Sequence, residues 1–213
     1  SKAEMGEDRI KPLSHSIESV LHHDYTDILA QCDLRFLRAY LHDNGGSEYK
    51  RLRRVLKSDL EDNFRAKWKE LKEKYPLPEQ KNLRRPRLCF HGTKRNLLDK
   101  IVETGLKVPD GKEVKHVCDD GWWGKGIYVS YDADYSAGYS EDGRLIVCAC
   151  LCGKVYNCVD RRDGGALEEG YDSHVAEDGS EFVLFENSQV LPLFVLEEKP
   201  QPKPVAPKPA AAK

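Results

Sequence analysis

Apolar residues recur at helical intervals in the first part of the chain. Between Ile17 and Leu41 they stand mostly three or four positions apart, and Asn44-Gly45-Gly46 then interrupts the pattern as a helix C-terminus would. A second helical pattern runs from Leu52 to Tyr75, where Pro76 ends it. The sequence therefore predicts an N-terminal helical segment over residues 1–85.

After Pro86 the pattern changes to short apolar runs separated by glycine. Residues 96–104 are typical of one short helix, with Gly105 at its end. A chain of mostly strands with few helices favours an α+β fold over a repeated βαβ unit. The predicted strands are residues 87–90, 126–130, 144–152, 181–184 and 190–196.

The last part of the chain has a different composition. Residues 199–213 consist almost entirely of Pro, Ala and Lys, with too little apolar surface to form a packed core. We predict a disordered tail there, which leaves residues 86–198 as the second folded part.

Composition excludes little by itself. The chain has 213 residues, of which 39% are hydrophobic and 33% charged, and its net charge of −2 predicts neither membrane nor nucleic-acid binding. No run approaches the ~18 apolar residues of a membrane helix, and no secretory leader opens the sequence. We therefore expect an intracellular protein, in the nucleus or cytoplasm, with no membrane partner.

Basic residues are concentrated between residues 50 and 87. Such a cluster can bind phosphates of a nucleic acid, because phosphate binding rewards clustered cations. The simpler interpretation is a solvated helix face with ion pairs between residues four positions apart. We favour the second interpretation and keep nucleic acid as an alternative partner.

The seven cysteines predict free thiols. Their number is odd, and the chain shows no sign of secretion. Cys148, Cys150 and Cys152 alternate along an apolar run, so a strand would place them on one face. That spacing is a poor match to the turn-borne cysteine pairs of zinc sites, and we predict buried structural cysteines and no metal.

The common dinucleotide, phosphate-loop and metalloprotease motifs are absent from the sequence. Four short sequence motifs instead contain the candidate binding and catalytic residues. A histidine followed by glycine lets a flat amide ligand approach bare backbone. Tyrosines offer faces for stacking a heterocycle, and a glutamate that opens an apolar strand can stand at the rim of a cleft. The pieces are Phe90-His91-Gly92-Thr93, Gly124-Lys125-Gly126-Ile127-Tyr128-Val129-Ser130, Tyr135-Ser136-Ala137-Gly138-Tyr139 and Ser180-Glu181-Phe182-Val183-Leu184-Phe185.

In this order the pieces resemble the poly(ADP-ribose) polymerase catalytic domain, of the diphtheria-toxin-like ADP-ribosyltransferases with a His-Tyr-Glu triad. The resemblance covers roughly residues 86–198. It implies the ADP-ribosyltransferase fold, in which two mainly antiparallel sheets pack together with few helices. It also implies NAD⁺ as co-substrate without a metal, and transfer of ADP-ribose to an acceptor protein, which includes the chain itself through automodification.

The resemblance assigns roles to matching residues. His91, Tyr128 and Glu181 would be the catalytic residues, with His91 and Glu181 bonding ribose hydroxyls of NAD⁺. Gly92 and Ser136 would hold the nicotinamide carboxamide. Tyr139 would stack on the nicotinamide ring, with Tyr128 against its other side. Trp122 and Trp123 occupy the stretch that forms the loop over NAD⁺ in this family, so they would cover the NAD⁺. The alternative is that both tryptophans are ordinary packing residues.

One departure bears on the product. Polymer-forming members commonly carry Lys immediately before the serine, whereas this chain has Tyr135. We therefore expect transfer of single units or short chains, and not of long polymers. A different class of function stays open beside the enzyme: a catalytically inactive NAD⁺- or ADP-ribose-binding adaptor.

Overall fold

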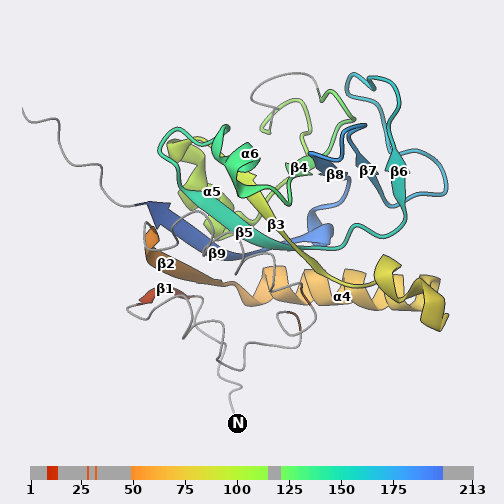
Figure 1. Cartoon of the computed structure of the whole chain (residues 1–213). Coiled ribbons are helices and arrows are strands. Elements are labelled where there is room, and N and C mark those ends of the chain that lie inside the picture. The colour runs from red at the N-terminus through yellow and green to blue at the C-terminus, as the bar shows by residue number, and fades with distance from the viewer. Residues whose placement is uncertain (1–8, 14–27, 29–31, 33–48, 115–120, 199–213) are drawn as a thin grey trace, which may run out of the picture.

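Two sheets form the centre of the molecule (Figure 1). A computed structural model describes residues 9–13, 28, 32, 49–114 and 121–198, and all structural statements refer to these. The first sheet has the order β1-β2-β9-β5-β3, in which all neighbouring strands are antiparallel. Its strands are β1 (Arg9–Leu13), β2 (Tyr49–Leu56), β3 (Arg87–Gly92), β5 (Leu145–Cys150) and β9 (Val190–Glu198).

The second sheet is smaller and has the order β4-β8-β7-β6. Only the β6–β7 pair is parallel. Its strands are β4 (Ile127–Val129), β6 (Val155–Asn157), β7 (Ser173–Val175) and β8 (Phe182–Leu184). Two mainly antiparallel sheets with few helices confirm the predicted α+β class.

Three α-helices and two short 3₁₀ helices lie around these sheets in the described part of the chain. The α-helices are α4 (Ser58–Lys74), α5 (Arg95–Thr104) and α6 (Ala133–Ala137), and the 3₁₀ helices are η2 (Pro78–Leu83) and η3 (Asn187–Gln189). The predicted helix before Gly105 is confirmed: α5 ends there, and Gly105 has a φ of 75°, which favours glycine.

The helix predicted from Leu52 to Tyr75 is wrong at its start. Residues 49–56 form strand β2, and α4 begins only at Ser58. Leu52, Val55 and Leu56 are spaced as on a helix, but β2 pairs with β9 on one side and with β1 on the other, and this long-range pairing overrides the local pattern. The first sheet therefore includes strands from both sides of residue 85.

The helix predicted between Ile17 and Leu41 lies outside the described residues, except for Ile28 and Cys32, which are both buried. The predicted tail at residues 199–213 also lies outside them. In the part of the chain that is described, no helix is long and apolar enough to cross a membrane.

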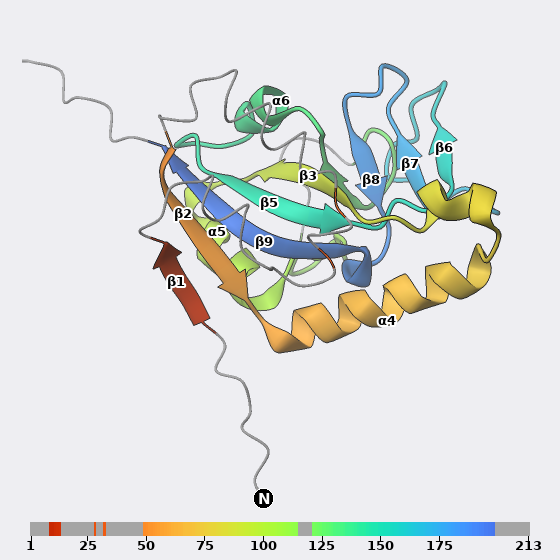
Figure 2. The ribbon, with the colours of Figure 1, turned by 60° about the horizontal axis from the view of Figure 1, so that its bottom comes forward.

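The two faces of the first sheet are covered differently (Figure 2). On one face, Phe64, Trp68 and Leu71 of α4 pack against alternate residues of β5. On the other face, Leu98 and Val102 of α5 pack, together with the second sheet, against the remaining β5 residues. Strand β5 is therefore buried on both sides, which explains its continuous apolar sequence.

The cysteines of β5, and Cys152 just after it, follow the predicted alternation. Cys148, Cys150 and Cys152 belong with Cys89 to the packed face that meets α5 and the second sheet. They are free and buried, and burial raises the pKa of the Cys148 and Cys150 thiols well above the ordinary value. These cysteines are packing residues of the core; Cys118 lies outside the described residues.

Most basic side chains of α4 are already paired. Arg65 bonds Glu61 one turn earlier, and Lys69 lies near Glu73. Lys67 bridges to Glu186 at 2.7 Å. The first two pairs are of the kind expected for a solvated helix face, whereas the buried Lys67 ties α4 to the residue before η3.

Asp172 ties the end of α4 to the second sheet. Its carboxylate accepts hydrogen bonds from Lys74 (2.6 Å) and Tyr75 (2.5 Å) of the helix end, and from the backbone N–H of Lys154 (2.7 Å). Burial alone would raise the pKa of this carboxyl, but the bonds from Lys74 and Tyr75 hold it below its usual value. The ionised form is therefore part of the folded state.

We predict that Asp172→Asn lowers the free energy of unfolding by about 2 kcal/mol at neutral pH, because a charge-assisted network loses its anion. A depressed pKa in the folded state adds stability above the unfolded value near 3.8, and that stability is lost as the pH falls through the folded value. The difference between wild type and variant, measured by urea unfolding, is therefore expected to shrink below about pH 4. A difference that stays constant down to acid pH contradicts this role.

Candidate active site

A cavity of about 360 Å³ lies between β3, α5, β4 and α6. The structure brings all the sequence-predicted site residues to its wall, although they come from separate parts of the chain. They are His91, Gly92, Tyr128, Ser136, Tyr139 and Glu181.

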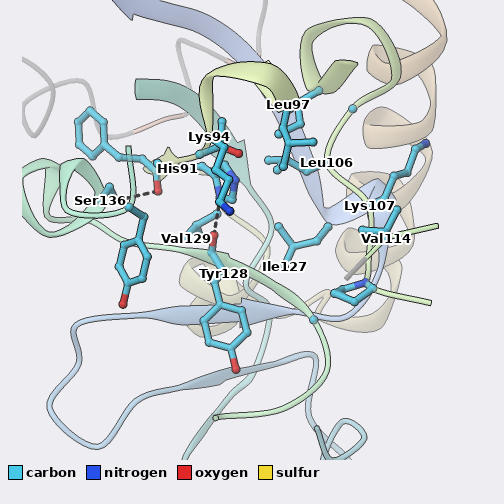
Figure 3. A pocket seen from close by; sticks show the side chains of 18 of the residues that line it. His91, Lys94, Leu97, Leu106, Lys107, Val114, Ile127, Tyr128, Val129 and Ser136 are labelled. Atoms are coloured by element: carbon cyan, nitrogen blue, oxygen red, sulfur yellow. Dashed lines mark hydrogen bonds between the residues drawn. The ribbon is translucent and has the colours of Figure 1, made fainter. Parts of the chain in front are cut away.

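His91 stands at the end of β3 and is held by a neighbouring strand (Figure 3). Its Nδ1 lies 2.8 Å from the backbone carbonyl oxygen of Tyr128. A carbonyl can only accept, so Nδ1 carries the proton and the other ring nitrogen is left as an acceptor in the neutral form. Burial lowers the pKa of His91, although the bond to Tyr128 opposes this effect. The imidazole is therefore neutral at pH 7, with a fixed orientation.

Gly92 allows α6 to approach β3 closely. A Cβ placed on Gly92 would lie 1.8 Å from the backbone oxygen of Ser136, a distance that no side chain can occupy. In the same contact the Ser136 hydroxyl donates to the carbonyl of Phe90 at 3.1 Å, as Figure 3 shows. The serine oxygen therefore keeps its lone pairs for a ligand, and its position is set by β3.

Helix α6 is short, and its first turn is fixed by a side-chain cap. Asp132 accepts hydrogen bonds from the backbone N–H groups of Asp134 and Tyr135. This cap directs the following residues toward the cavity wall. Tyr135 and Tyr139, one turn apart, have ring centroids 5.6 Å apart and hydroxyl oxygens 3.2 Å apart. Tyr139 is 43% exposed, so its ring offers an accessible face at the cavity.

Tyr128 joins the cavity to the loop before β4. Its hydroxyl accepts from the backbone N–H of Trp123 (2.8 Å) and donates to the carbonyl of Gly124 (2.9 Å). In Figure 3 its ring points away from His91, while its backbone carbonyl meets the imidazole. Tyr128 thus lines the cavity and also fixes the loop.

Neither Trp122 nor Trp123 is among the described residues that line the cavity. The Trp122 ring is 44% exposed and lies under the Arg161 guanidinium, with 4.1 Å to the ring centroid. The carbonyl of Trp123 accepts from Nδ1 of His174 at 2.7 Å. Trp122 therefore lies at the surface and the Trp123 backbone contacts His174, and a role for either residue in covering NAD⁺ stays a prediction.

Glu181 is held at the cavity by its backbone. Its carbonyl accepts from the N–H of Ala176 at 2.9 Å, which closes the turn before β8. The preceding carbonyl, of Ser180, accepts from the Ser130 hydroxyl at the end of β4. Glu181 is therefore carried by a different element from His91, and the β3–β4 bridge together with the β4–β8 pairing brings both residues to one cavity.

Sequence reasoning missed the other half of the cavity. Residues of α5 and of the stretch after it line that half, including the apolar Leu97, Ile101 and Leu106. Lys94, Lys100 and Lys107 stand around them. No motif marks these residues, because the spacing of the apolar residues in α5 is that of an ordinary amphipathic helix.

The family comparison agrees with this geometry. A model of the poly(ADP-ribose) polymerase catalytic domain matches residues 41–178, which is more than half of the chain. The chain belongs to the poly(ADP-ribose) polymerase catalytic domain family. The match begins before β2, so in this poly(ADP-ribose) polymerase domain the β2–α4 unit falls inside the family region. A comparison with curated proteins found no match.

Membership of the poly(ADP-ribose) polymerase family means NAD-dependent ADP-ribosyltransferase chemistry, with NAD⁺ as the substrate. Glu181 lies just beyond the matched residues, so its role rests on its place at the cavity. Among the described residues, no group of three or more His, Cys, Asp or Glu side chains could hold a metal ion.

We predict that Gly92→Ala disrupts the contact between β3 and α6. The added methyl would overlap the Ser136 carbonyl, so α6 must move. We expect a loss of at least about 2 kcal/mol in unfolding free energy and loss of nicotinamide binding, measured by urea unfolding and calorimetry. Gly138→Ala is the matched control in the same segment, because its Cβ would lie 3.2 Å from the nearest atom. Equal behaviour of both variants contradicts the prediction.

Proposed function

We propose that this domain binds NAD⁺ in the cavity, breaks the bond between nicotinamide and ribose, and transfers ADP-ribose to an acceptor. The single observation that carries the proposal is the meeting of His91, Tyr128 and Glu181 at one cavity in a chain of this family. Three separate segments supply these residues, and the pairing of β3, β4 and β8 brings them together.

The α6 side of the cavity suits the nicotinamide. Ser136 donates to Phe90, so its oxygen can accept a hydrogen bond from the carboxamide N–H. Gly92 leaves the backbone bare for the same amide. The exposed face of Tyr139 would be covered by a stacked pyridinium ring, which suits a cationic aromatic ligand.

The α5 side suits the adenosine diphosphate part. Lys94, Lys100 and Lys107 provide cations for the two phosphates, and Leu97 with Ile101 provides apolar surface for a flat base. Between the two halves, the unprotonated nitrogen of His91 accepts a ribose hydroxyl. The cavity thus divides into a nicotinamide end and a phosphate end.

Glu181 acts where the charge develops. As the bond from ribose C1′ to nicotinamide lengthens, nicotinamide leaves with the electron pair and the sugar becomes cationic. A fixed carboxylate stabilises that cation more than the uncharged ribose of the ground state. The acceptor then forms a bond to C1′ and loses its proton, which Glu181 can take.

We further propose that the product is a single ADP-ribose unit or a short chain. The support is Tyr135, which stands immediately before Ser136 where polymer-forming members commonly carry Lys, and which lines the cavity beside Glu181. The acceptor side therefore has an aromatic neighbour and no cation at this position.

Glu181→Gln is predicted to lower nicotinamide release from NAD⁺ by about 10²–10³-fold while NAD⁺ affinity changes little, because the carboxylate acts mainly in the transition state. Labelled NAD⁺ followed onto the protein itself, together with nicotinamide release, measures both transfer and cleavage. Glu177→Gln is the matched control, since Glu177 lies exposed in the same turn and away from the cavity.

The same experiment separates the enzyme from an adaptor. A wild-type protein that binds NAD⁺ without releasing nicotinamide would favour the inactive binding module. Equal turnover by wild type and Glu181→Gln would remove Glu181 from the mechanism.

NAD⁺ affinity is predicted to stay constant between about pH 7 and pH 8.5, because the lowered pKa keeps His91 neutral throughout this range. His91→Ala is expected to weaken NAD⁺ binding about tenfold by removing one ribose hydrogen bond. Isothermal titration of both proteins at several pH values provides the measurement. A wild-type titration in this range that His91→Ala abolishes would show the histidine changing charge, contrary to the prediction.

A further inference from the structure

Ser130 stands where three parts of the cavity wall meet. It follows Val129, the last residue of β4, and its hydroxyl makes two hydrogen bonds. It donates to the backbone carbonyl of Ser180 at 2.5 Å and accepts from the backbone N–H of Asp132 at 3.0 Å. Ser130 is only 2% exposed, so water hardly competes for these bonds. The hydroxyl therefore joins the residue before Glu181 to the residue that caps α6.

The backbone of Ser130 bonds the first sheet. Its N–H donates to the carbonyl of Phe90 at 3.0 Å, and its carbonyl accepts from the N–H of Phe90 at 2.7 Å. The regular pairing of β4 with β8 ends one residue earlier, where Val129 lies opposite Phe182. Beyond that pair, the hydroxyl of Ser130 makes the connection to the chain before β8.

Glu181 lies between two fixed peptide groups. The peptide before it contains the Ser180 carbonyl, which Ser130 holds. The peptide after it contains the Glu181 carbonyl, which accepts from the N–H of Ala176 at 2.9 Å. Since each peptide group is planar, holding both planes fixes the direction of the Cα–Cβ bond of Glu181. The bond from Ala176 lies within one turn. The bond from Ser130 instead ties Glu181 to β3, the strand of His91.

We propose that Ser130 is a positioning residue: its hydroxyl holds the peptide before Glu181, so that the carboxylate has a fixed place at the cavity when the ribose becomes cationic. The role rests on the proposed function, because it acts through Glu181. A carboxylate that is already in place needs no reorganisation during the reaction. Binding of NAD⁺ in the ground state is assigned to other residues of the wall, so the hydroxyl of Ser130 acts on the rate and not on the affinity.

The test combines Ser130→Ala with Glu181→Gln in a double-mutant cycle that follows nicotinamide release from NAD⁺. Ser130→Ala removes the hydroxyl, while Asp132 keeps the α6 cap through its own carboxylate. We expect kcat to fall about tenfold and the KM for NAD⁺ to change less than about twofold, because the carboxylate is misplaced but the binding wall is kept. In the Glu181→Gln background, Ser130→Ala is expected to lower kcat no further, since the residue through which it acts is already changed.

Ser173→Ala is the matched control for the loss of a buried hydroxyl. Ser173 on β7 is fully buried and donates to the carbonyl of Cys152 at 2.6 Å, and it is not one of the described residues that line the cavity. This variant is expected to lose stability and keep its kcat. Ser130→Cys is a second variant, of nearly the same size but with a weak donor, from which a fall in kcat is also expected. Thermal unfolding shows which variants are folded.

The outcomes separate the two proposals. A folded Ser130→Ala or Ser130→Cys variant with the kcat of the wild type overturns the positioning role and leaves the proposed function intact. The same follows if Ser130→Ala lowers kcat equally in both backgrounds, or if Ser173→Ala lowers kcat as much. Absence of nicotinamide release from the wild type overturns the proposed function and the positioning role with it.

Discussion

The arrangement of the cavity depends on the close contact of α6 with β3 at Gly92. At this point the backbone oxygen of Ser136 occupies the space that any side chain on residue 92 would need. The contact places Ser136 beside the carbonyl of Phe90 and sets the direction of helix α6, which ends two residues before Tyr139. This steric constraint fixes the wall of the cavity to which we assign the nicotinamide.

A second set of contacts aligns the two sheets around that point. Phe90 of the first sheet exchanges backbone hydrogen bonds with Ser130 at the end of β4, and β4 pairs with β8. His91, Tyr128 and Glu181 then lie on adjacent segments at one edge. Because β5 is buried on both faces, the floor beneath them has little freedom to shift. The site is therefore positioned by the core and not by loops alone.

Much of this could be predicted from the sequence, and the limits have physical causes. The strands predicted at residues 87–90, 144–152 and 190–196 contain mostly apolar residues, and the structure confirms them as β3, β5 and β9. Strands β6 and β7 have only three residues each and no periodic signal, so they are defined by pairing alone. Strand β2 imitates a helix locally and becomes a strand through β9.

The site likewise has residues that a local motif marks and residues that no motif marks. Motif order was enough to predict which residues gather at the cavity, because each motif contains a residue with a special shape or charge. It could not reveal the lysines and apolar residues of α5, since their spacing is that of an ordinary amphipathic helix. Nor could it reveal that the Tyr128 ring bonds the loop at Gly124 while its backbone carbonyl orients His91.

The separate support of Glu181 has an evolutionary consequence. The carboxylate is carried by the turn that Ala176 closes, whereas the ligand-gripping wall belongs to β3 and α6. On the proposed function, exchange of that one side chain would stop the reaction and leave the NAD⁺-binding wall of β3 and α6 unchanged. The proposed enzyme and the alternative binding module would then differ by a single substitution in the same architecture.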